Sequence, residues 1–187
     1  VQDLLSLDVA GLNQHLSSTT AGAGGLIMLP FLNGERTPAL PTANGSLLGL
    51  SMDNLTPANL CRAAVEGATF NLRYGLDLLR DGGIQSDVIR LIGGGSNSKL
   101  WRQIAADIMN TPVICPSVGE AAALGSAIQA MWCHSHWTGE PVELSTLCSH
   151  CVAVDKDSRV EPRAENAMRY EQVYQSYLEA LNCLHSV

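Results

Sequence analysis

Three consecutive glycines, Gly93 to Gly95, follow the apolar run Val88–Ile92 and precede a polar stretch that could begin a helix near Ser98. Glycine tolerates positive φ angles and lets a ligand approach the bare backbone. A helix N-terminus adds unpaired N–H groups and the positive end of the helix dipole, which favour an anion. A strand, a glycine bend and a helix in this order are therefore typical of a nucleotide site, although a simple glycine turn with a helix cap has the same pattern.

The nucleotide interpretation assigns six adjacent residues to the cofactor. The glycines offer backbone, and the three short polar side chains that follow add hydrogen-bonding groups. Two familiar nucleotide motifs do not fit, because a Walker A loop ends in Gly-Lys-Ser/Thr and a dinucleotide fingerprint needs a further glycine at position 98. The candidate binding residues are Gly93, Gly94, Gly95, Ser96, Asn97 and Ser98.

Three other groups of chemically capable residues are predicted to be structural. Arg62 and Glu66, spaced i and i+4, should form a supporting salt bridge on one helix. Glu35 and Arg36 could be a charged catalytic pair, but we favour an ion pair within a turn. Cysteine and histidine side chains between 133 and 151 could bind zinc, but their spacing matches no familiar closed site, so we assign no metal ligand. The zinc candidates are Cys133, His134, His136, Cys148, His150 and Cys151.

The elements that position the bend follow from the apolar periodicity of the chain. Thr56 and Pro57 are a typical helix start, and this helix should run to about Arg80, before Gly82 and Gly83 end it. A long, polar, turn-rich surface loop is expected at 33–45. Further helices are predicted over 3–18, 98–109, 120–133 and 163–184, and short strands over 26–31, 47–50, 88–92 and 113–115.

Residues 88–133 thus have the order strand, helix, strand, helix. A helix that connects two short strands implies that the strands are parallel neighbours joined by a right-handed crossover. This order predicts an α/β fold. Ligands of open α/β sheets bind beyond the carboxyl ends of the strands, which is where the glycine bend lies.

Composition excludes several classes of protein. With 187 residues, 46% hydrophobic and 16% charged, the chain can bury a core and is not disordered. A net charge of −7 argues against a nucleic-acid surface. No secretory leader or apolar run of membrane-spanning length is visible, and the six cysteines in mostly apolar or helical surroundings indicate a reduced, cytoplasmic protein. The start, VQDLLSLD, has no Met and reads as a segment of something longer.

Four stretches occur in an order that has a known counterpart. They are PFLNGERTP at 30–38, RAAVEG at 62–67, LIGGGSNSKLWRQIAADIMNTPV at 91–113 and EAAALGSA at 120–127. In this order they resemble the P-x-L-x-G-E-R-x-P loop, the R-A-x-x-E-G helix start, the adenosine-binding segment and the closing E-A-x-A-L-G-A-A helix of the FGGY carbohydrate kinases. The resemblance extends over about residues 30–130.

This resemblance implies the actin-like ATPase (ribonuclease H-like) fold. Residues 1–187 would form the C-terminal lobe of a two-lobe sugar kinase, with a core at about 24–135 and a helical tail at about 160–187. Members of the family transfer the γ-phosphoryl group of ATP to a sugar hydroxyl, with Mg²⁺, in a cleft between the lobes. The absent N-terminal lobe of the same protein would therefore be an essential partner.

Individual positions take their expected roles from the same resemblance. Gly94 and Gly95 fall where the family packs backbone against the α-phosphate and ribose. Ser98 falls where related kinases place an adenine-contacting side chain, often Asn. Gln103 and Asp107 read as structural. The family's catalytic Asp and its D-x-G-T phosphate loop lie upstream, and neither motif occurs in this chain, so we assign it no catalytic residue.

The resemblance is strongest to family members that phosphorylate D-xylulose, forming D-xylulose 5-phosphate and ADP. Members that act on ribulose, gluconate or glycerol are an alternative, and a non-catalytic nucleotide-binding module is another. The expected partners are the sugar, ATP and the other lobe, with a homodimer as a further option and neither nucleic acid nor membrane. Tyr170, Tyr174 and Tyr177 of the last helix are expected in the core or at such a dimer interface.

Overall fold

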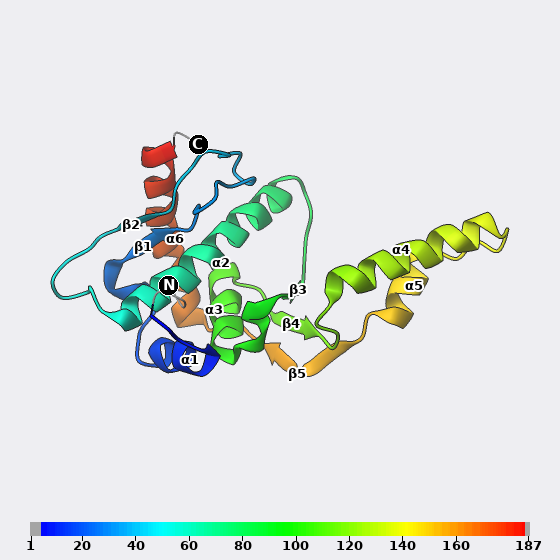
Figure 1. The fold of residues 1–187 in the computed structure, drawn as a ribbon, viewed down its shortest axis with the longest axis horizontal. Coiled ribbons are helices and arrows are strands. Elements are labelled where there is room, and N and C mark those ends of the chain that lie inside the picture. The colour runs from blue at the N-terminus through cyan, green and yellow to red at the C-terminus, as the bar shows by residue number, and fades with distance from the viewer. Residues whose placement is uncertain (1–4, 186–187) are drawn as a thin grey trace.

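The computed structural model describes residues 5–185 and shows a body of packed helices and short strands from which one helical hairpin extends (Figure 1). Two single 3₁₀ turns lie at Ala23–Gly25 and Gly94–Asn97. The helices are α1 (Val9–Ser17), α2 (Pro57–Asp81), α3 (Lys99–Met109), α4 (Ala121–Trp137), α5 (Leu144–Cys151) and α6 (Ala164–His185), and the strands are β1 (Ile27–Leu29), β2 (Ser46–Leu48), β3 (Ile89–Arg90), β4 (Val113–Pro116) and β5 (Val154–Val160).

The strands form two small sheets. Strands β1 and β2 pair antiparallel, whereas β3 and β4 pair parallel and are connected by α3, so the predicted parallel pair is confirmed. Strand β5 adds antiparallel to β4 and was not predicted. Its sequence, VDKDSRV, carries four charged residues and reads as a loop, but it lies at the edge of the sheet, where charged side chains are common.

Local capping explains where two helices begin. The predicted helix over 3–18 starts only at Val9, because the Asp8 side chain accepts a hydrogen bond from the Gly11 N–H and caps the helix there. Residues 3 and 4 of that prediction lie outside the described range. The predicted start of α2 is confirmed, since the Thr56 hydroxyl accepts from the Asn59 N–H and Pro57 is the first helical residue.

The main apolar core lies where α2 packs against α1, α3, α6 and β1. Phe70 of α2 packs against a row of three tyrosines from α6, with ring centroids 5.4–6.0 Å apart. The core contains residues from both ends of the described chain, from α1 and from α6. The tyrosines predicted for a core or an interface pack within the chain itself. These tyrosines are Tyr170, Tyr174 and Tyr177.

A buried carboxylate joins the elements around this core. One oxygen of Glu66 accepts from Arg62 Nε at 2.6 Å, from the Tyr170 hydroxyl at 2.7 Å and from the Gly22 N–H at 3.0 Å. Arg62 also donates to the Tyr170 hydroxyl and to the carbonyl of Leu16 at the end of α1. Burial raises the pKa of the Glu66 carboxyl group, and its ion pair and hydrogen bonds oppose that shift. The predicted salt bridge is thus confirmed, and it links α1, α2 and α6.

Helices α4 and α5 form a hairpin that extends away from the body (Figure 1). Helix α4 runs to Trp137, four residues beyond its predicted end, and only its Ile128 is buried. Its apolar side chains Met131 and Trp137 are 49% and 87% exposed. Even so, no helix among residues 5–185 is long and apolar enough to cross a membrane.

The Glu66 cluster gives a direct stability prediction. Arg62→Met should lower the free energy of unfolding by about 3–5 kcal/mol, because it leaves a buried carboxylate without its cation. The matched substitution Arg159→Met breaks the exposed pair with Glu161 and should cost no more than about 1 kcal/mol. Urea-induced unfolding followed by circular dichroism measures both values. Equal losses for the two variants would contradict the role assigned to Arg62.

Candidate nucleotide-binding site

A hollow of about 520 Å³ lies beyond the carboxyl ends of the parallel strands β3 and β4. The glycine bend after β3 forms one wall, and the loop Ser117–Glu120 after β4 forms another. This is the position where open α/β sheets bind ligands. The hollow also meets Cys115 of β4, Arg102 of α3 and Asp155 of β5.

The bend is held by its own hydrogen bonds. Gly93 has φ 86°, which favours glycine, and its carbonyl accepts from the Ser96 N–H at 3.0 Å and the Ser96 hydroxyl at 2.7 Å. A Cβ atom added to Gly94 would meet no protein atom within 4 Å. The backbone of Gly93 and Gly94 is therefore exposed at the hollow, while the turn that carries it is fixed.

Gly95 is needed for packing rather than for an open backbone. A Cβ atom there would lie 3.0 Å from carbons of the Trp101 ring, which is tighter than nine in ten real Cβ contacts. Trp101 cannot easily yield, because its indole N–H donates to the Thr69 hydroxyl of α2 at 3.0 Å. The third glycine thus lets the bend lie directly on the tryptophan that fixes α3 to α2.

Ser98 is also turned away from the hollow. Only 2% of the residue is exposed, and its hydroxyl accepts from the Trp101 N–H as the N-cap of α3 and donates to Asn13 of α1. A side chain engaged in this way has no free group for an adenine base. Of the six predicted residues, the structure brings Gly93, Gly94, Ser96 and Asn97 to the hollow, and it places Gly95 and Ser98 behind it.

Arg102 is a lining residue that the sequence reasoning missed. Its amide N–H donates to the carbonyl of Ser98 in the first turn of α3, and its Nη1 donates to the carbonyl of Ser96 at 2.8 Å. The sequence could have indicated this residue, because it lies four residues after the helix cap and therefore on the face of α3 that carries the bend. It brings a positive charge to a hollow that is otherwise lined by the exposed carboxylates Glu120 and Asp155.

The residues predicted to be structural are indeed tied into the fold. Asp107 accepts from Gln103, Arg163 and Asn166, so it joins α3 to the start of α6. Glu35 differs from expectation, because residues 5–185 contain no ion pair between it and Arg36. Its carboxylate instead accepts the N–H groups of the two residues after it and the side-chain amide of Asn71. It therefore stabilises its own loop on α2.

The cysteine and histidine residues of the α4–α5 hairpin do not assemble into a site. All six cysteines are free thiols. Within the described residues no three side chains of His, Cys, Asp or Glu gather in a way that would hold a metal ion.

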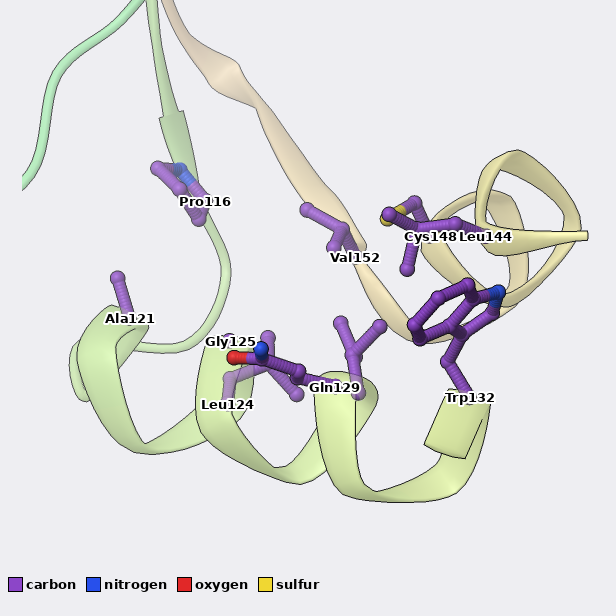
Figure 2. Close-up of a pocket in the computed structure, with 10 residues that line it drawn as sticks. Pro116, Ala121, Leu124, Gly125, Gln129, Trp132, Leu144, Cys148 and Val152 are labelled. Carbon is purple, nitrogen blue, oxygen red and sulfur yellow. The ribbon is translucent and has the colours of Figure 1, made fainter. Parts of the chain in front are cut away.

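A second hollow of about 420 Å³ lies between α4 and α5 (Figure 2). Trp132 of α4 and Leu144 and Cys148 of α5 lie at one end, and Pro116 lies at the other (Figure 2). Its lining is apolar apart from the amide of Gln129, with no charged group to bind a phosphate. The hollow at the glycine bend is therefore the better candidate for a nucleotide.

Comparison with known proteins identifies the family of the chain. Residues 8–134 match the C-terminal domain of the FGGY family of carbohydrate kinases. The chain belongs to the FGGY family. Among curated proteins, it is 47% identical over 185 residues to a xylulose kinase of Haemophilus influenzae, covering 99% of this chain and 36% of that protein. It thus spans about a third of the length of the curated relatives it matches.

Solved structures of FGGY kinases share the fold. A ligand-bound xylulose kinase from Lactobacillus acidophilus matches with a TM-score of 0.84 at 27% identity, over 96% of this chain and 35% of that one. A gluconate kinase from the same organism matches with a TM-score of 0.81 at 28% identity, over 94% and 34% of the two chains. The predicted α/β class and actin-like ATPase fold, as a C-terminal FGGY domain, are confirmed.

Gly94 and Gly95 should respond differently to substitution. Gly95→Ala should lower the free energy of unfolding by about 1–3 kcal/mol, because the new methyl group collides with the anchored Trp101 ring. Gly94→Ala should change it by no more than about 0.5 kcal/mol, because its methyl group meets open space. Denaturant unfolding of the two variants and the parent checks this, and equal stabilities would refute the packing role of Gly95.

Proposed function

We propose that this chain is the nucleotide-binding part of the C-terminal lobe of an ATP-dependent kinase that phosphorylates D-xylulose to D-xylulose 5-phosphate. The observation that carries the proposal is the exposed backbone of Gly93 and Gly94 at the carboxyl ends of two parallel strands, in a chain of the FGGY family. The sugar is inferred from the relatives, several of which are named xylulose kinases and align over most of this chain.

The role of this chain in the reaction is to position ATP. The fixed turn at Gly93–Asn97 offers backbone and short polar groups to the nucleotide. Phosphoryl transfer depends mainly on placing the reacting groups in line and on neutralising the charge that develops. We assign no catalytic base to this chain, and we expect the base and the remaining phosphate contacts from the N-terminal lobe, which is part of the proposal.

The described residues contain no cluster of carboxylate, thiol and imidazole groups suited to a metal ion. A Mg²⁺ ion in a kinase is usually held by the substrate phosphates, water and one or two carboxylates. We propose that the ion arrives with ATP, and we assign none of its ligands to the described residues.

A rival substrate has specific support. The gluconate kinase matches with nearly the same TM-score as the xylulose kinase from the same organism. This chain provides the nucleotide side in our proposal, and the sugar contacts lie mainly outside it. Similarity over this chain therefore separates the kinase class from other functions better than it separates one sugar from another.

A substrate panel tests the proposal. The intact protein that contains this chain is assayed with ATP and D-xylulose, ribulose, gluconate or glycerol, by coupling ADP formation to NADH oxidation. We expect the kcat/KM for D-xylulose to exceed each of the others by at least about tenfold, a difference of about 1.4 kcal/mol in transition-state binding. Preferred turnover of another polyol would reject the substrate, and nucleotide binding without any sugar phosphorylation would favour a non-catalytic module.

A further inference from the structure

Arg102 differs from the other arginines that are at least partly buried, because its charge has no ion-pair partner among the described residues. Arg62, Arg73 and Arg80 are each at least partly buried, and each forms an ion pair with a carboxylate. Arg102 is also partly buried, yet it forms no ion pair with any carboxylate of residues 5–185. An arginine that is partly removed from water usually has an anionic partner, because desolvation of an unpaired charge is costly.

The hydrogen bonds of Arg102 are also incomplete. Only Nη1 has a partner among the described residues, the carbonyl of Ser96. The Nε atom is buried without a hydrogen-bond acceptor, and Nη2 has none either. A guanidinium group has five donors in a planar fork that suits phosphate and carboxylate groups, so most of its capacity is unused here.

The position of Arg102 shows where the missing anion belongs. The side chain lines the same hollow as Gly93, Gly94 and Asn97. The carboxylates of Glu120 and Asp155 line it as well, but both are exposed to solvent, and neither pairs with Arg102. Asp155 accepts instead from the N–H of Asp157. Because Nε is buried and Nη1 is bonded to Ser96, Nη2 is the part of the guanidinium that is left for a ligand in this hollow.

We infer that Arg102 binds a phosphate group of the nucleotide and, through its bond to the Ser96 carbonyl, holds the glycine bend in the shape that admits it. This inference rests on the proposed function, because it takes the ligand of the hollow to be a nucleotide. It adds a charge-dependent contact to the backbone contacts of the glycines. Arginine suits this role because its planar fork can bond the bend and the phosphate at the same time.

The two parts of the inference make separable predictions. Loss of a charged hydrogen bond to phosphate weakens binding of ADP and leaves binding of adenosine, which has no phosphate, unchanged. Loss of support for the bend would weaken both ligands to the same extent. The ratio of adenosine to ADP affinity therefore reports on the phosphate contact and is insensitive to a structural effect.

The test is a titration of ADP, AMP and adenosine into the intact protein, by calorimetry, for the parent and three variants. Arg102→Gln should weaken ADP binding by about tenfold to a hundredfold more than it weakens adenosine binding, because the charged hydrogen bond to phosphate is lost in addition to the support of the bend. Arg102→Lys keeps the charge without the fork and should fall between the parent and Arg102→Gln. Lys99→Gln is the matched control, because Lys99 is an exposed cation on α3 that does not line the hollow, and both ligands should bind as in the parent.

Each outcome decides between the possibilities. Equal weakening of ADP and adenosine, or no weakening of either, would overturn the phosphate contact. Equal weakening together with a large drop in melting temperature would give Arg102 a purely structural role and would also overturn the phosphate contact. If the parent binds none of the three ligands, the proposed function fails, and this result is distinct from any effect of the substitution.

Discussion

The hydrogen bonds and the ion pair of the buried Glu66 carboxylate hold α1, α2 and α6 together, and the arrangement of this chain depends on them. A single oxygen accepts hydrogen bonds from α2, from α6 and from the loop after α1, and Arg62 extends the cluster to the last turn of α1. Leaving such a group unpaired inside a core costs several kcal/mol, so the three elements are favoured only in this arrangement. The Arg-Ala-x-x-Glu-Gly stretch of α2 thus specifies tertiary structure as well as a helix. Its glycine, Gly67, allows α2 to approach β1, where a Cβ atom would lie 2.2 Å from the carbonyl oxygen of Met28.

The proposed nucleotide site is connected to this cluster through α3. The indole of Trp101 bonds to α2, the Ser98 hydroxyl bonds to α1, and Asp107 bonds to the start of α6, so α3 is fixed at both ends and in the middle. Because α3 is the crossover between β3 and β4, fixing it also fixes the carboxyl end of β3, where the glycine bend lies, and the start of β4. The glycine bend has little freedom once these contacts are made. Gly95 and Ser98 serve that positioning, and the surface that lines the hollow is left to Gly93, Gly94 and their neighbours.

The sequence predicted the parts of the fold that depend on local signals. Thr56 and Pro57 mark the start of α2, and the pattern of strand, helix and strand around Gly93 implied the parallel pair that the structure contains. Strand β5 was missed because its charged residues at 155–157 resemble a loop until β4 is placed beside it. The unpaired state of Arg102 could not be foreseen either. It depends on which carboxylates of distant segments come within reach, and only the folded structure shows that none of the described ones does.

In the proposed site, the bare backbone at Gly93 and Gly94 meets the nucleotide at the ends of the parallel strands. The most direct measurement is a crystal structure of the intact protein with bound ADP. We expect density for the α-phosphate and ribose against the bend, in the hollow between Gly93–Asn97 and the loop Ser117–Glu120. Nucleotide density at another place, with this hollow filled by side chains of the protein itself, would contradict it.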